Sequence, residues 1–146
     1  SFRKIVSKKL KIKNSSNIKK LIKRKIRKDK SLIIKLEKIV HPLVRKEMHK
    51  FIKTNRKKLF IFLEIPLLIE SKLMKFFDII VFIKAKKSIR LKRFISKGGN
   101  KDIFNLLDGK QLSDTNKTKY SDYVVVNEKN INILKRKLSD ILKNYE

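Results

Sequence analysis

The sequence predicts an α/β fold with a parallel sheet, because apolar runs typical of buried strands alternate with segments of helical periodicity. The first run spans residues 59–65 and directly precedes Pro66, which cannot donate to a strand ladder. A second run spans 78–83, and a third spans 123–126 and ends at Asn127. Short apolar runs bounded by turn signals suit strands that are buried on both faces, as in parallel sheets. Helical segments between such strands indicate crossover connections.

The first helical segment is expected near residue 18. Residues 1–13 mix basic and apolar side chains, and 14–17 form a turn or helix-start signal. Residues 18–26 then carry apolar side chains at helical spacing, with Lys and Arg between them.

A second helix is expected before the first strand. Ser31 is a suitable N-cap for a helix over 32–40. Proline disfavours helical conformation in the residue before it, so the helix is expected to end or kink at His41, before Pro42. Helical spacing then continues to about Lys53.

The rest of the chain alternates short helices with the second and third strands. Gly98 and Gly99 should break a helix, and the polar segment 112–121 is expected to be a loop. We find no internal repeat and no second domain, so residues 1–146 are expected to form one domain. Helical segments are expected at 72–76, 89–96, 101–111 and 131–142.

Charge is the strongest compositional feature of the 146-residue chain. It has 41 Lys and Arg against 13 Asp and Glu, a formal net charge of +28. Such a field attracts nucleic acids and anionic membranes. However, the excess is mainly Lys, with many Ile and Asn, which is the set that AT-rich codons favour. We therefore favour compositional drift, together with an anionic substrate, over a nucleic-acid partner.

Other features of composition exclude several classes of protein. The absence of Cys excludes disulfides, and two His without Cys argue against a structural zinc site. No apolar run approaches the ~20 residues that cross a bilayer, and the start lacks the apolar core of a secretory signal. A cytoplasmic protein without a membrane partner, and a monomer, is expected.

Three sets of residues could form a site. Glu64 and Glu70 follow the first strand, and ligands of open α/β sheets bind at the carboxyl ends of strands. Arg90 and Arg93, three residues apart on a helix, could bind phosphate oxygens. His41 could contact a substrate. The alternatives are two solvated carboxylates, a solvated basic helix face and a structural histidine.

Taken together, these motifs resemble the dephospho-coenzyme A kinase family from about residue 15 to the end. Departures are mild: Ile69 stands where the family usually has Phe, Ser121 stands for Ala, and glycines lie in the lid. No metal-ligand set accompanies the motifs. The matching residues, in order, are His41-Pro42, Pro66-Leu67-Leu68-Ile69-Glu70, Phe77-Asp78, Arg90-Leu91-Lys92-Arg93, Gln111, Lys117, Ser121-Asp122 and Asn127.

The resemblance implies a P-loop kinase, a three-layer α/β/α fold with a parallel sheet, here lacking its first strands. Substrate-side helices would occupy about 15–57, and the core strands and lid 58–146. The activity implied is ATP-dependent, Mg²⁺-assisted phosphorylation of the ribose 3′-hydroxyl of dephospho-coenzyme A. Arg90 and Arg93 would be lid residues that bind ATP phosphates, and Asn127 would lie near the adenine. The acceptor side would be lined by His41, Pro66, Leu67 and Glu70.

Two motifs of the family are not found in residues 1–146: the glycine-rich loop ending in Gly-Lys-Ser, and an Asp-x-Asp that contains the base. The P-loop Lys and the catalytic Asp are therefore expected upstream of Ser1. Without them phosphoryl transfer should be very slow, so residues 1–146 alone are expected to be inactive and poorly stable. The alternatives are a catalytically dead paralogue and a small basic nucleic-acid-binding protein.

Overall fold

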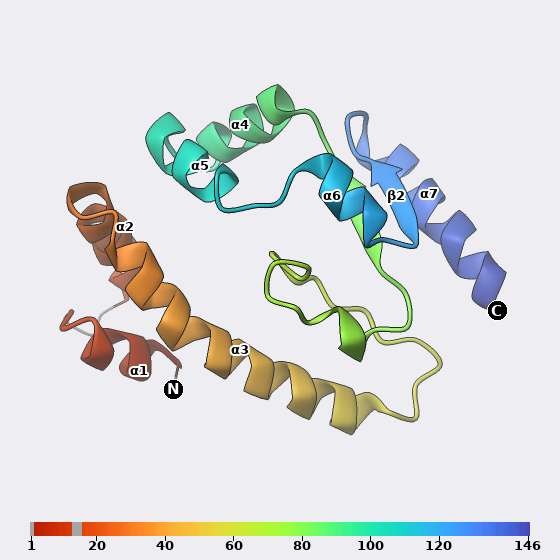
Figure 1. Cartoon of the computed structure of the whole chain (residues 1–146), viewed down its shortest axis with the longest axis horizontal. Coiled ribbons are helices and arrows are strands. Elements are labelled where there is room, and N and C mark those ends of the chain that lie inside the picture. Colours follow the sequence, from red (N-terminus) through yellow and green to blue (C-terminus); the bar gives the residue numbers. More distant parts are fainter. Residues whose placement is uncertain (1, 13–15) are drawn as a thin grey trace. The chain divides into compact units, whose positions relative to one another are not determined.

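The computed structural model describes residues 2–12 and 16–146. By internal contacts the chain divides into two compact units, Ser1–Leu63 and Glu64–Glu146. Helices dominate the described part of both units, and the described strands belong to the second unit (Figure 1). Each unit is described by itself.

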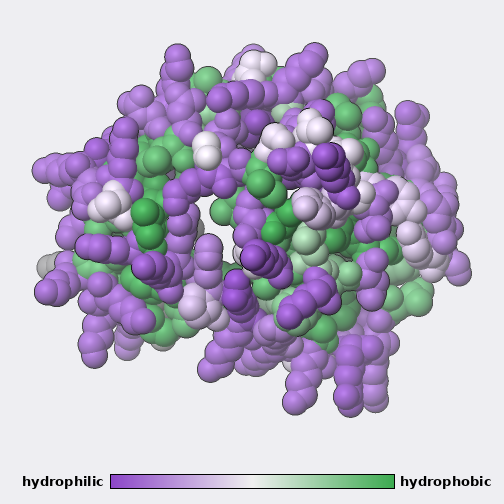
Figure 2. All heavy atoms as spheres, in the orientation of Figure 1, coloured by the Kyte–Doolittle hydropathy of each residue, from purple (hydrophilic) through white to green (hydrophobic). Residues whose placement is uncertain are grey.

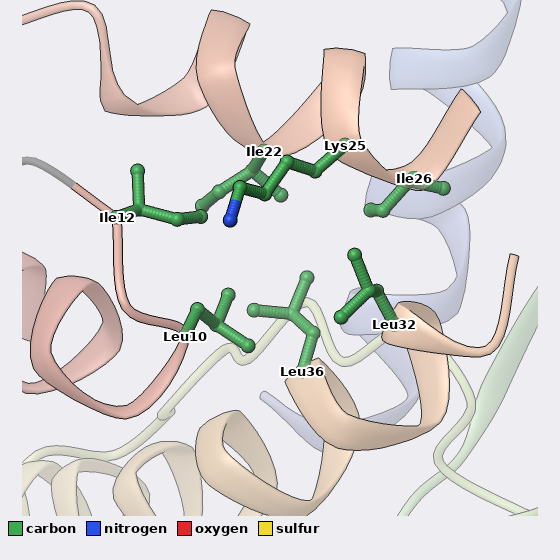
Figure 3. Close-up of a pocket in the computed structure, with 7 residues that line it drawn as sticks. All are labelled: Leu10, Ile12, Ile22, Lys25, Ile26, Leu32 and Leu36. Carbon is green, nitrogen blue, oxygen red and sulfur yellow. The ribbon is translucent and has the colours of Figure 1, made fainter. Parts of the chain in front are cut away.

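The first unit consists of three helices, α1 (Phe2–Lys9), α2 (Ile18–Lys28) and α3 (Leu32–Asn55). α1 and α2 each contact α3. A small pocket among them is lined by six aliphatic side chains and Lys25, whose side chain extends toward Ile12 (Figure 3). Apart from Lys25, the lining side chains are aliphatic, so the pocket is mainly a packing contact. The buried core residues of this unit are Val6, Ile18, Ile26, Ile33 and Met48.

The second helix of the sequence prediction does not end at His41. α3 runs through His41 and Pro42 without interruption. A proline inside a helix removes one backbone hydrogen bond. Ile33 and Met48, on either side of Pro42, are both buried, so packing of both halves keeps the helix continuous.

The start of α3 lies where it was predicted, but its cap differs. The Ser31 side chain accepts no capping hydrogen bond; its hydroxyl donates to Asp29 Oδ1 at 2.6 Å. Hydrogen bonds from the Ser31 hydroxyl and amide lower the pKa of Asp29. Of the turn predicted at 14–17, residues 14 and 15 lie outside the described part of the chain, and Ser16 and Asn17 form a turn.

The second unit contains a two-stranded parallel sheet, β1 (Val81–Lys84) and β2 (Tyr123–Val126). Val81 pairs with Tyr123, and the register continues to Lys84 opposite Val126. The predicted α/β fold with a parallel sheet is therefore confirmed, with β1 shorter than the run 78–83. The remaining elements are η1 (Met74–Phe76), α4 (Lys87–Ser96), α5 (Lys101–Asp108), α6 (Asp114–Lys119), α7 (Ile131–Leu142) and η2 (Lys143–Tyr145).

The strand predicted at 59–65 is wrong. These residues form no strand, and Leu59 and Phe62 are 80% and 66% exposed. A strand satisfies its backbone groups through a neighbour, and none of the described residues forms a ladder with this segment. This apolar run is therefore irregular because no described segment pairs with it.

The loop predicted at 112–121 is also wrong in part, since α6 occupies 114–119. The Ser113 side chain caps α6 by accepting from the Asn116 amide at 3.2 Å. Asp114 lies in the first turn, where a negative charge interacts favourably with the helix dipole. The helix expected at 101–111 ends at Asp108.

The break after α4 has a steric cause. Gly98 has a φ of 77°, which favours glycine. A Cβ on Gly99 would lie 2.2 Å from the Phe94 ring. Both glycines are therefore required where the chain leaves α4.

Hydrophilic side chains cover most of the face seen in Figure 2, with hydrophobic groups between them. Among the residues described, no helix is both long enough and apolar enough to cross a membrane.

Candidate functional site

The parallel pairing of β1 and β2 brings their carboxyl ends to one edge of the sheet. The ladder continues one residue further, where the Asn127 amide donates to the Lys84 carbonyl at 2.8 Å. α4 begins at Lys87, shortly after β1 leaves this edge. This is the edge where open α/β sheets bind ligands, and the chain places basic side chains there.

Two of the predicted ATP-binding residues lie together at this edge. Arg93, on α4, donates from Nη1 to the backbone oxygen of Asn127 at 3.0 Å. The Arg93 side chain is exposed, so its remaining N–H groups are open to solvent. This hydrogen bond links the residue after β2 to α4 and holds the Arg93 guanidinium beside the carboxyl end of β2.

Arg90, one turn before Arg93, is held by several groups. Its Nε donates to the Ala85 carbonyl at 3.1 Å, and its Nη1 pairs with Asp108 on α5. Its guanidinium lies 5.8 Å from the centre of the Phe104 ring, a cation–π contact. Arg90 is therefore already oriented at the start of α4, with 32% of its side chain exposed.

Asp108 holds two cations of α4, since Lys87 Nζ also lies 3.0 Å from its carboxylate. Burial opposes ionisation of Asp108, but the hydrogen bonds from Lys87 and Arg90 outweigh it, so its pKa lies below the ordinary value. The carboxylate is thus ionised at neutral pH and fixes α4 to α5.

The turn at Pro66–Lys72 is irregular and locally strained. Leu67 and Lys72 adopt φ angles of 61° and 56°. Residues other than Gly and Asn seldom occupy this left-handed region of backbone conformation. Within the turn, the Ser71 amide donates to the Leu67 carbonyl at 2.9 Å and the Leu73 amide to the Leu68 carbonyl at 3.1 Å.

The structure brings three motif residues together beside this turn. Glu70 Oε1 accepts from the Leu112 amide at 2.9 Å and lies 3.4 Å from Lys117 Nζ. Lys117 Nζ also donates to Gln111 Oε1 at 2.6 Å. Only 15% of the Glu70 side chain and 12% of the Lys117 side chain are exposed.

The contacts of three carboxylates were missed by the sequence reasoning. Asp122 Oδ2 accepts from the Ile80 amide at 2.7 Å, and Glu128 accepts from the Lys86 amide at 3.0 Å. Both contacts span 42 residues of sequence, and that between Asp108 and Arg90 spans 18. No local spacing signal links such partners, although Asp122 was part of the family motif.

The side chains of the remaining predicted residues differ in their exposure. His41 is an exposed side chain within α3, in the first unit. Pro66 and Glu64 are exposed, and Leu67 is half-buried. Within residues 2–12 and 16–146, no three His, Asp or Glu side chains gather in a way that could hold a metal ion.

A family model described as dephospho-CoA kinase matches residues 12–132 of the chain. Curated relatives agree with this match. The chain is 31% identical over 113 residues to the dephospho-CoA kinase of Rickettsia typhi, covering 77% of this chain and 59% of that protein. It is 32% identical over 111 residues to that of Bartonella henselae, covering 74% and 57%.

A third relative, the dephospho-CoA kinase of Blochmanniella pennsylvanica, is 34% identical over 113 residues, covering 75% of this chain and 53% of that protein. The chain therefore spans between half and three-fifths of the length of these relatives. These matches favour the family that the motifs indicated over a small basic nucleic-acid-binding protein.

Proposed function

The chain belongs to the dephospho-CoA kinase family, and from this premise we propose that the whole protein transfers the γ-phosphoryl group of ATP to the ribose 3′-hydroxyl of dephospho-coenzyme A. ADP and coenzyme A would be the products. ATP would enter as its Mg²⁺ complex, as in kinases generally. The observation that carries the proposal is the family match over residues 12–132.

Arg90 and Arg93 would bind the phosphates of ATP. Charge develops on the phosphoryl oxygens during transfer, and guanidinium groups held in advance stabilise it without reorganisation. The contacts of Arg90 with Ala85 and of Arg93 with Asn127 support this role, because they place both cations near the carboxyl edge of the sheet. Asn127 would lie near the adenine.

The acceptor side would be formed by His41 and the turn residues Pro66, Leu67 and Glu70. Strained backbone is found preferentially at ligand sites, and the φ of Leu67 supports a ligand-contacting role for this turn. The proposed organisation is one kinase domain, with substrate-side helices at about 15–57 and core strands and lid at 58–146. We further propose a cytoplasmic monomer.

The test has two stages. First, the reading frame upstream of the Ser1 codon is determined and examined for Gly-x-x-x-x-Gly-Lys-Ser/Thr and Asp-x-Asp. Second, the full-length protein is assayed for ADP and coenzyme A formation from ATP and dephospho-coenzyme A. Formation of both products supports the proposal. A full-length protein that lacks both motifs and forms no coenzyme A would instead be a catalytically dead paralogue.

Exchange of Arg93 for Met provides the residue-level test. If Arg93 binds phosphate, Arg93→Met should weaken ATP binding about tenfold or more, since a charge-assisted contact is lost. Lys92→Met, on the exposed face of the same helix, is the matched control and should leave ATP binding unchanged. Equal effects of the two variants would indicate general electrostatic attraction and not a phosphate contact.

A further inference from the structure

The Glu70 clamp, defined as the Glu70 carboxylate with the Leu112 amide, Lys117 and Gln111, joins two segments far apart in sequence. Glu70 and Leu112 are hydrogen-bonded although 42 residues separate them in the sequence. Taking an ion pair out of water is costly unless further hydrogen bonds compensate. Here Glu70 accepts a hydrogen bond from the Leu112 amide, and Lys117 donates one to the Gln111 side chain. These two hydrogen bonds compensate the lost hydration of the ion pair.

One side of the clamp is the strained turn. Left-handed backbone is unfavourable for residues with a Cβ, such as Leu and Lys, and both Leu67 and Lys72 adopt it. The hydrogen bonds inside the turn join near neighbours only. The contacts of Glu70 with Leu112 and Lys117 therefore supply an anchor from outside the turn.

The other side of the clamp is attached to the sheet. Lys117 lies on α6, and its ammonium is 5.6 Å from the centre of the Phe82 ring on β1. α6 also contacts β1. Glu70 and Lys117 thus connect the turn to β1, the strand that precedes α4.

We infer that Glu70, on the proposed acceptor side, acts as a positioning residue, whose carboxylate holds the Pro66–Leu67 corner in place for the acceptor. This inference rests on the proposed function. An unpaired carboxylate would repel an anionic acceptor such as dephospho-coenzyme A. Paired with Lys117 and bound to the Leu112 amide, Glu70 can lie beside such a site without presenting its full charge.

The experiment compares Glu70→Gln, Lys117→Met and Lys117→Arg in the full-length protein. Dissociation constants for dephospho-coenzyme A and for ATP are measured by calorimetry, together with kcat and both KM values. We expect Glu70→Gln and Lys117→Met to weaken acceptor binding and raise its KM about tenfold. The ATP constants and kcat should change less than twofold, and Lys117→Arg should return the acceptor KM to within about threefold of wild type.

Glu128→Gln is the matched control. Glu128 has the same two kinds of contact, a backbone amide at 3.0 Å and a lysine ammonium at 3.5 Å, but its partner for both is Lys86. It should leave the acceptor KM within twofold of wild type. An equal effect at Glu70 and Glu128 would indicate general loosening and would overturn the inference.

Other outcomes also decide the inference. A fall in kcat with an unchanged acceptor KM in Glu70→Gln would assign Glu70 to the chemical step. If Glu70→Gln and Lys117→Met leave the dissociation constants, kcat and both KM values unchanged, the clamp has no role in acceptor binding and the inference is wrong. If the wild type does not bind dephospho-coenzyme A, the proposed function fails; hydrogen exchange at Leu112, expected to be at least fivefold faster in Glu70→Ala, then decides whether the clamp exists.

Discussion

Replacement of Asp108 by Asn tests whether the contact between α4 and α5 is held by charge. The carboxylate pairs with Arg90 and lies 3.0 Å from Lys87, and 15% of its side chain is exposed. A hydrogen bond to a charged group contributes about 1.5–3 kcal/mol. Lys87 is 60% exposed, so its share is only a few tenths of a kcal/mol.

Two effects reduce the expected loss. Arg90 is 32% exposed, so solvent screens part of its interaction, and an Asn side chain still accepts one hydrogen bond. We therefore expect Asp108→Asn to lower the free energy of unfolding by about 1–2 kcal/mol at pH 7. That corresponds to a change of about 5- to 30-fold in the unfolding equilibrium.

The assay is urea unfolding followed by tyrosine fluorescence. The chain has no Trp, and its three Tyr, at 120, 123 and 145, all lie in the second unit with Asp108. The signal therefore reports the unit that contains the perturbation. Asp140→Asn is the control, since the Asp140–Lys143 pair is largely exposed, and should change stability by less than about 0.5 kcal/mol.

The effect should depend on pH in a defined direction. Because the folded-state pKa of Asp108 is lowered, the stabilisation is complete above the unfolded-state pKa and is lost as pH falls through the folded value. The difference in the free energy of unfolding between wild type and Asp108→Asn should therefore be constant from pH 5 to 8 and become smaller below about pH 4. Equal stability of the two proteins at pH 7 would refute the reasoning.

Three further predictions concern the fold. Val125 is 3% exposed on β2 and Val126 is 41% exposed, so Val125→Ala should cost about 2 kcal/mol and Val126→Ala less than about 1 kcal/mol in the same unfolding assay. Equal losses would mean that this strand is not packed as described. The Asn130 side chain accepts from the Ile133 amide at 3.1 Å, so Asn130→Ala should destabilise the second unit by about 1 kcal/mol, measured by its urea midpoint. Pro42 is exposed inside α3, so Pro42→Ala should stabilise this helix by about 1–3 kcal/mol, seen as a higher melting temperature by far-ultraviolet circular dichroism; a lower one would show that Pro42 is needed there.

Elements with strong local signals were predicted closely. β2 spans the Tyr123–Val126 run, and α7 spans the predicted 131–142. Local sequence explains one boundary of each element. Asn127 directly follows the apolar run and ends β2, and Asn130 caps the start of α7. The start of α6 also had a signal, Ser113 before Asp114, that the polar composition of the segment concealed.

The sequence by itself determined the alternation of helices and apolar strands, the placement of Arg90 and Arg93 on one helix, and the ordered motifs of the family, because each depends on neighbours along the chain. Only the tertiary structure decided that 59–65 remains irregular, that α3 continues through Pro42, and that Glu70 meets Lys117. Pairing, packing and burial act between residues distant in sequence, and spacing along the chain carries no record of them.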